Sequence, residues 1–235
     1  MTTPLVLVPG HMCDGAMWAH QAETLGDIAE ITIADVTRGA SVGELAASIL
    51  DQTPARFALA GLSLGGYICF EVMRQAPERV SHLALLDTTA RADPPEITAR
   101  RHRFIGMARE GRLDEVMAAY LPLFVHPRRL EDEPFKAALS AMSTRVGEAA
   151  FYTQQDAMLS RPDSRPDLGA IRCPTLVMCG RQDALTPVDM HREMASLIPG
   201  AKLVIIEDSG HLTTMEQPQA TTAVLRYWLQ ERPQL

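Results

Sequence analysis

The chain has 235 residues, 46% of them hydrophobic and 22% charged, a composition that excludes wholesale disorder and fits one domain with an insertion. Its formal net charge of −7 disfavours nucleic-acid binding, because that function needs a basic face to displace counterions from phosphates. The four cysteines form no CxxC pair and have no histidine at metal-ligand spacing, so we expect reduced thiols, no metal and no cofactor. We find no signal-peptide pattern and no run approaching about 20 apolar residues, so we expect a cytoplasmic protein without a membrane partner.

The first 90 residues alternate short apolar runs with longer amphipathic stretches, which predicts repeated strand–helix units. Strands are expected at Leu5–Val8, Ile31–Ala34, Phe57–Ala60 and His82–Leu86, and helices at Ala16–Leu25, Val42–Gln52 and Leu64–Ala76. Ser41, with Glu44 three residues later, has the pattern of a capping box before the second helix. Because the expected strands are apolar throughout, the pattern favours a parallel sheet covered by helices on both faces.

The alternation stops after the fourth expected strand. Residues 91–166 show no strand pattern and instead predict helices at Pro95–Glu110, Leu113–Leu121, Pro134–Met142 and Gly147–Leu159. Strands then return at Thr175–Cys179 and Leu203–Ile206, with helices at Val188–Ile198 and Gln217–Gln230. We therefore expect one α/β core made of residues 1–90 and 167–235, with residues 91–166 inserted as a helical cap.

The sequence Gly61-Leu-Ser63-Leu-Gly65 lies between an expected strand and an expected helix, the context of a nucleophile elbow. Glycines on both sides of Ser63 relieve the clashes of a tight turn, and the serine is expected in a strained conformation with its hydroxyl exposed. The N–H of Leu64 opens the helix and points toward any oxyanion that develops. The alternative is a glycine-rich turn with an incidental serine.

A serine hydroxyl is a weak nucleophile, so it needs a base and a carboxylate that orients the base. His211 is the candidate base and Asp183 the candidate carboxylate; each follows an expected strand, as Ser63 does. Because the carboxyl ends of parallel strands meet at one edge of a sheet, the three side chains are expected there together. Alternatively, Asp183 is a turn or capping residue, His211 a surface histidine, and Asp87 a substitute acid or a supporting partner.

Over essentially its whole length, the chain resembles the capped, single-domain α/β-hydrolases. The resemblance is carried by Leu5–Gly10, Gly61–Gly65, Gly180–Asp183 and Ser209–His211. It implies an α/β-hydrolase fold with a helical cap and a reduced, mainly parallel six-stranded sheet covered by helices. The sheet is expected to be reduced because the two strands with which the family sheet commonly begins are missing before Leu5.

The same resemblance implies the rest of the site. His11, which follows Gly10, is expected to supply the second oxyanion N–H beside that of Leu64. Pro9 stands where the family carries histidine, which leaves Met12 as the alternative donor. Residues expected at the substrate pocket are Met12, Trp18, Phe124 and Leu212.

These features predict a metal-independent serine hydrolase that cleaves a small carboxylic ester, thioester or lactone through an acyl-enzyme. A serine at the elbow disfavours epoxide and halide chemistry, for which relatives use aspartate. Arg100, Arg101 and Arg103, on the first expected cap helix, form either a solvated face or a grip for a carboxylate or an acyl carrier protein. The alternatives are a carbon–carbon bond hydrolase of ring-cleavage products, a ligand receptor or signalling protein on this fold, and an acyl transferase or perhydrolase.

Overall fold

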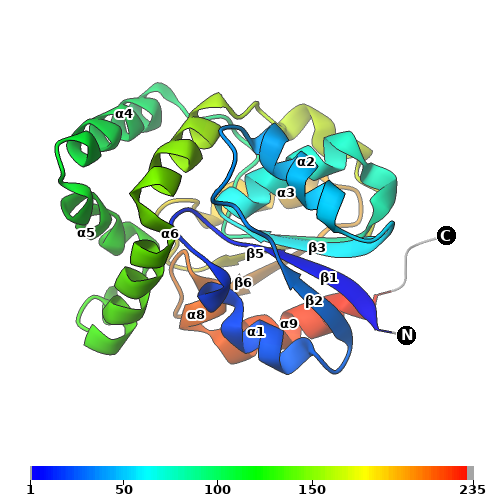
Figure 1. Cartoon of the computed structure of the whole chain (residues 1–235). Helices are drawn as coiled ribbons and strands as arrows, with labels where there is room; N and C mark the ends of the chain where they lie inside the picture. The colour runs from blue at the N-terminus through cyan, green and yellow to red at the C-terminus, as the bar shows by residue number, and fades with distance from the viewer. Residues whose placement is uncertain (1, 232–235) are drawn as a thin grey trace.

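The structure is a computed structural model that describes residues 2–231, and its centre is a six-stranded sheet in which all strands run parallel. The strands are β1 (Thr3–Val8), β2 (Ala29–Ile33), β3 (Phe57–Leu62), β4 (Val80–Leu86), β5 (Thr175–Gly180) and β6 (Lys202–Ile206). They lie in the order β2-β1-β3-β4-β5-β6 (Figure 1). The predicted reduced, parallel sheet is confirmed, and each expected strand is present with its ends shifted by at most two residues.

The place of a strand in the sheet decides how far it is buried. Every residue of β3 and of β5 is buried, whereas the edge strands β2 and β6 keep partly exposed positions. The chain passes from β1 outward to β2 and then crosses to β3 on the other side of β1. In an open parallel sheet such a reversal leaves a crevice at the carboxyl ends of the two adjacent strands, here β1 and β3.

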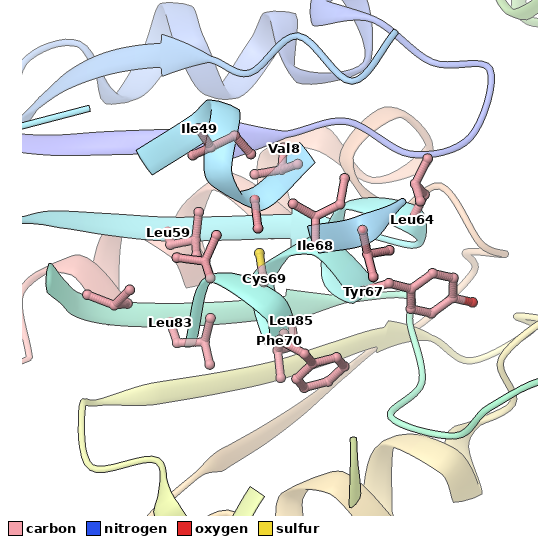
Figure 2. Packing of buried hydrophobic residues seen from close by; sticks show 14 of the residues in the cluster. Val8, Ile49, Leu59, Leu64, Tyr67, Ile68, Cys69, Phe70, Leu83 and Leu85 are labelled. Atoms are coloured by element: carbon pink, nitrogen blue, oxygen red, sulfur yellow. The ribbon is translucent and has the colours of Figure 1, made fainter. Parts of the chain in front are cut away.

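Helices cover both faces of the sheet. One face carries α2 (Val42–Gln52), α3 (Leu64–Gln75) and α7 (Val188–Leu197), and the other carries α1 (Ala19–Leu25), α8 (Thr213–Glu216) and α9 (Pro218–Leu229). Figure 2 shows the first face, where Ile68 and Cys69 of α3 pack over Leu59, Leu83 and Leu85 of the sheet. Each fully buried aliphatic side chain of this size stabilises the fold by about 1.5–3 kcal/mol.

The inserted segment forms three α-helices, α4 (Pro95–Arg109), α5 (Leu113–Phe124) and α6 (Glu133–Ser160), with a short 3-10 helix at Pro127–Arg129 between the last two. They lie beyond the carboxyl ends of the strands (Figure 1). Phe104, Tyr120 and Phe151 from these helices make a third apolar cluster with Met12, which comes from the loop after β1. None of the helices between residues 2 and 231 has the length and apolar character that a membrane span needs.

The helix α6 consists of two helical segments that meet at a kink, and they correspond to the two helices expected at Pro134–Met142 and Gly147–Leu159. The first segment continues through residues 143–146, and the helical conformation is interrupted at Gly147, whose φ of 82° and ψ of 165° are not helical. A residue without a side chain adopts this conformation at low cost, so the chain changes direction there between the two segments. The helix α5 also extends past Leu121, through Pro122, to Phe124.

The start of α2 agrees with the sequence. The hydroxyl of Ser41 accepts a hydrogen bond from the N–H of Glu44 at 3.1 Å, as a capping box requires. The carboxylate of Glu44 accepts from the N–H of Ala40 at 2.9 Å, one residue before the position that the motif predicts. The expected helix Ala16–Leu25 instead begins as a 3-10 helix, Gly15–Trp18, before α1.

Candidate active site

Ser63 lies in the tight turn between β3 and α3. Its φ of 56° and ψ of −114° belong to a region that L-residues rarely adopt, so the expected strained turn is present. The N–H of Ser63 donates to the carbonyl of Leu86 at 3.0 Å, and the hydroxyl of Thr88 donates to the Ser63 carbonyl at 2.8 Å. A β-carbon at Gly65 would lie 2.2 Å from the carbonyl oxygen of Val8, so the approach of α3 to β1 requires glycine there.

The structure brings the three sequence-predicted side chains together at the carboxyl edge of the sheet. His211 Nε2 lies 2.8 Å from Ser63 Oγ, and His211 Nδ1 lies 2.8 Å from Asp183 Oδ2. His211 and Asp183 are buried, with exposed fractions of 2% and 5%. They follow β6 and β5, as Ser63 follows β3, so three separate strand ends position one hydrogen-bonded chain.

The two oxygens of Asp183 have different tasks. Oδ1 accepts from the N–H groups of Leu185 and Thr186 at 2.8 and 2.9 Å, which is the bond pattern of a turn-forming aspartate. Oδ2 faces His211 and also accepts from the Thr186 hydroxyl at 2.7 Å. Asp183 therefore organises its own turn and meets the imidazole at the same time.

The Asp183–His211 contact sets the charge of both groups. Burial disfavours a charged Asp183, but His211 and the Thr186 donors hold the pKa of Asp183 below its ordinary value. Burial likewise disfavours a charged His211, yet the Asp183 carboxylate raises the pKa of His211 above the ordinary 6.5. An imidazole in this setting accepts a proton from a neighbouring hydroxyl more readily than a free one.

Asp87, the alternative acid, does not contact His211 Nδ1. Its carboxylate accepts from the N–H of Gly180 at 3.0 Å and from the N–H and hydroxyl of Thr213 at 3.2 and 2.6 Å. Complete burial and the charge of Asp183 raise the pKa of Asp87 well above its ordinary value. These bonds tie β5 to the start of α8, so Asp87 supports the strand ends that carry the other two groups.

Sequence reasoning missed the groups that hold the His211 loop. The N–H of His211 donates to the carbonyl of Phe124 at 2.8 Å, which ties this loop to the inserted helices. The buried carboxylate of Glu216 accepts from the N–H groups of His126 and Gly210 at 2.7 and 2.8 Å. In the sequence, Glu216 looks like an ordinary residue near a helix start, and its distant partner His126 gives no local signal.

Two consecutive N–H groups in the loop after β1, those of His11 and Met12, differ in their hydrogen bonding. The N–H of Met12 donates to Gln154 Oε1 at 2.9 Å. Among residues 2–231, no acceptor is bonded to the N–H of His11 or to that of Leu64. The structure thus favours His11 over the alternative Met12 as a free donor beside Ser63.

The His11 side chain is fixed by two glutamines of α6. Its Nδ1 donates to Gln154 Oε1 at 2.9 Å, and its Nε2 accepts from Gln155 Nε2 at 3.1 Å. Burial, together with the charge of Arg101, lowers the pKa of His11 to about 3, so the ring is neutral. The residue pair on α6 therefore positions the loop after β1.

Two cavities lie on the side of the sheet that carries Ser63, and they share two wall residues. The first, of about 470 Å³, is lined by Ser63 and His211, and the second, of about 360 Å³, is lined by Met12 and Leu212. His11 and Phe124 line both cavities. The Phe124 ring stacks on the His211 ring, with centroids 5.9 Å apart.

Trp18, expected at the substrate pocket, is a core residue instead. It is fully buried in the apolar cluster beneath α1 and α9 and lines neither cavity. The short 3-10 helix at Gly15–Trp18 directs this large ring toward the sheet, where its burial stabilises the fold.

The three arginines of the expected cluster lie in different environments in the structure. Arg103 is exposed, as a solvated face predicts, whereas Arg101 is buried and pairs with Asp93 at 2.5 Å. Arg100 and Arg101 line the first cavity, together with Arg161, which pairs with the other oxygen of Asp93 at 2.6 Å. The solvated-face interpretation therefore holds for one of the three residues only.

The described part of the chain offers no metal site: no group of three or more His, Cys, Asp or Glu side chains between residues 2 and 231 could hold an ion. The four cysteines form no disulfide. Burial, with the charge of Asp14, raises the pKa of Cys13 to about 12, so this thiol beside the second cavity is not a nucleophile at neutral pH.

The elbow after β3, the two strand-end partners and the inserted helices together define a hydrolase of a known fold. A family model described as the alpha/beta hydrolase fold matches residues 41–218. The chain belongs to the α/β-hydrolase family.

Individual relatives share this family and include esterases. A curated pimeloyl-[acyl-carrier protein] methyl ester esterase from Vibrio cholerae is 27% identical, across 92% of this chain and 90% of its own. The structure of a thermophilic esterase from Thermogutta terrifontis, solved with malate bound, is 30% identical with a TM-score of 0.88, and the match covers 97% of this chain and 90% of that one. The enol-lactonase from Burkholderia xenovorans reaches the same TM-score at 24% identity over 98% and 92% of the two chains, a likeness of fold alone. The two esterases support an ester-cleaving hydrolase.

Proposed function

We propose that this protein is a serine hydrolase that cleaves a small carboxylic ester through an acyl-enzyme intermediate. Ser63 is the nucleophile, His211 the general acid and base, and Asp183 the carboxylate that orients His211. The observation that carries the proposal is the pair of 2.8 Å contacts that links Ser63 Oγ, the His211 ring and Asp183 Oδ2. A weak hydroxyl nucleophile needs this arrangement in order to lose its proton during attack.

The reaction would proceed in two acyl transfers. Ser63 Oγ attacks the ester carbonyl carbon while His211 Nε2 takes the hydroxyl proton, and the carbonyl electron pair moves onto oxygen. Collapse of this intermediate breaks the ester C–O bond, and the alcohol leaves with the proton from His211. Water then loses a proton to His211, attacks the acyl carbon and releases the acid, while Ser63 regains its proton.

The oxyanion of each intermediate would be held by the N–H groups of Leu64 and His11. Both belong to the crevice between β1 and β3, and neither is bonded to an acceptor in the described chain. Leu64 is the first residue of α3, so the positive end of the helix dipole adds to the stabilisation of the oxyanion. Such fixed donors cost no reorganisation when charge develops.

Under this proposal, residues 1–90 and 167–235 form the catalytic core and residues 91–166 form the cap. The cavity beside Ser63 would take one part of the ester. Phe124, Met12 and Leu212 would border the part that enters the second cavity. A thioester or lactone undergoes the same acyl transfer. A methyl ester linked to an acyl carrier protein is also a candidate, because the Vibrio cholerae relative is named as an esterase of such a compound.

A covalent probe and a substrate panel test the proposal together. We expect a fluorophosphonate to label Ser63, as located by peptide mass spectrometry, and to abolish hydrolysis of p-nitrophenyl butyrate. The panel adds a thioester, a lactone and a dienoic ring-cleavage product. Cleavage of the last alone would favour carbon–carbon bond hydrolysis, and ligand binding without turnover of any compound would favour a receptor.

The rate is expected to fall at acid pH. His211 must be neutral to accept the Ser63 proton, and its pKa is raised above 6.5 by Asp183. Lowering the pH through that raised pKa protonates the ring, so kcat/KM should drop about tenfold per pH unit below it. A pH–rate profile with p-nitrophenyl butyrate checks this, and an acid limb centred below 6.5 would contradict it.

Gln154 is expected to position the oxyanion loop. Replacing Gln154 by leucine removes the acceptor of the Met12 N–H and of His11 Nδ1, which frees the loop after β1. Because the donor acts on the developing oxyanion, we expect kcat to fall about tenfold or more with little change in KM. Thr153→Ala, on the same turn of α6 but outside these bonds, is the matched control. Equal losses in both variants would show a general effect on α6 instead.

A further inference from the structure

The wall of the first cavity holds more positive than negative charge. It contains five arginines, Arg91, Arg100, Arg101, Arg161 and Arg165, and three carboxylates, Asp93, Glu96 and Asp163. Two of the arginines are neutralised at the rim, because Arg91 pairs with Glu193 at 2.7 Å and Arg165 pairs with Asp163 at 2.5 Å. Arg100, Arg101 and Arg161 remain. Among the described residues, these three arginines share one ion-paired carboxylate, that of Asp93.

That carboxylate, Asp93, is shared by two buried guanidinium groups. Arg101 binds one of its oxygens at 2.5 Å and Arg161 the other at 2.6 Å, and the side chains of the two arginines are 9% and 5% exposed. One negative charge therefore faces two positive charges in a poorly solvated place. The carbonyls of Met158 and Arg91 and the Tyr67 ring offset part of the cost of burying the Arg161 charge, and an entering anion would offset more of it.

Two buried donors beside this cluster have no acceptor. The Nε atoms of Arg100 and of Arg161 are shielded from solvent and unbonded within residues 2–231. Arg100 also forms no ion pair there, although Glu96 lies one helical turn before it on α4. A buried N–H of a charged group without an acceptor is a free-energy cost that a bound oxyanion would remove.

We propose that the cavity beside Ser63 binds an anionic group of the substrate, a compact oxyanion held by Arg100 and the Arg101–Asp93–Arg161 cluster while the ester lies at Ser63. The proposal deepens the proposed function, on which it rests for the placing of the ester. A carboxylate at the end of an acyl chain is the simplest such group, since the planar guanidinium fork matches its geometry. A phosphate in the leaving group presents the same chemistry.

Paired substrates measure the preference. Monomethyl and dimethyl glutarate have the same chain and scissile bond, but only the monomethyl ester carries an anion. We expect the wild type to favour the half-ester in kcat/KM by about tenfold or more, and Arg100→Gln to lower this ratio about tenfold. Arg103→Gln, an exposed neighbour outside the cavity, is the matched control and should keep the ratio. Arg100 is chosen because substitution of Arg101 or Arg161 would leave Asp93 less paired and endanger the fold.

A binding measurement separates this proposal from the proposed function. Calorimetric titration of Ser63→Ala with glutarate, with neutral glutaramide and with inorganic phosphate needs no turnover. Glutarate binding that is lost in Ser63→Ala/Arg100→Gln supports the proposal with a carboxylate as the anion. Phosphate binding with the same dependence supports it with phosphate as the anion. If neither anion binds, or if glutarate binds alone and an active esterase still shows no preference for half-esters, the proposal is overturned. Anion binding by a protein that cleaves no ester would overturn the proposed function alone.

Discussion

Replacing Ser63 by alanine is expected to lower kcat/KM for ester hydrolysis by about four to six orders of magnitude. The change removes the only protein atom that forms a covalent bond to the acyl group in the proposed mechanism, while the 2.8 Å contact between His211 and Asp183 remains. The residual rate would come from oxyanion donors and substrate positioning. Steady-state kinetics with p-nitrophenyl butyrate measure the loss, and circular dichroism checks that the fold persists.

The matched control is Ser160→Ala. Ser160 lies exposed at the end of α6, where its hydroxyl donates to the carbonyl of Asp156 at 2.8 Å, far in sequence from the elbow. Its replacement should change neither activity nor fluorophosphonate labelling. Activity retained in Ser63→Ala would contradict the assignment of Ser63 as the nucleophile.

Replacing Gly65 by alanine is expected to destabilise the protein by at least about 3 kcal/mol, which lowers the unfolding midpoint by roughly 6–12 °C. The new methyl group would lie 2.2 Å from the carbonyl oxygen of Val8, and rigid backbone on both sides leaves no side chain to rotate away. Either α3 moves off β1 or the elbow rebuilds. Thermal unfolding followed by circular dichroism measures the shift.

Gly106→Ala is the control for this substitution. Gly106 is inside α4, and nothing lies within 4 Å of the position that its β-carbon would take. Alanine there should stabilise the helix by up to about 1 kcal/mol, because glycine is the poorer helix former. A Gly65→Ala protein as stable as the wild type would show that the elbow tolerates a side chain.

Most strands and helices could be predicted from the sequence, because each one is encoded by a local pattern of apolar and polar residues. The central strands consist of consecutive apolar residues, so their burial inside a parallel sheet could be predicted. The proximity of Ser63, Asp183 and His211 could be predicted because each lies in the segment after a strand, and parallel strands present their carboxyl ends at one edge. The two helices expected within α6 are present on either side of Gly147, because a glycine in a helical pattern marks a position where the helix is easily interrupted.

Contacts between distant segments could not be predicted. Gln154 meets His11 across 143 positions, and Glu216 meets His126 across 90, so neither leaves a short-range pattern. Arg101 and Arg103 are alike in sequence, yet the packing of α4 buries one and exposes the other. Trp18 was placed at the pocket by resemblance, whereas the short 3-10 helix turns it into the core.

The hydrogen bond between the main chains of His211 and Phe124 affects which changes at position 124 the site can accept during evolution. The Phe124 group that binds the His211 N–H is a main-chain carbonyl, which every residue possesses. The Phe124 ring, in contrast, forms part of the wall of both cavities. A substitution at this position therefore reshapes both cavities but retains the hydrogen bond to the main chain of His211. Under the proposed function, mutation here changes which acyl groups fit and removes the ring that stacks on His211, while the main-chain bond to the His211 loop is inherited.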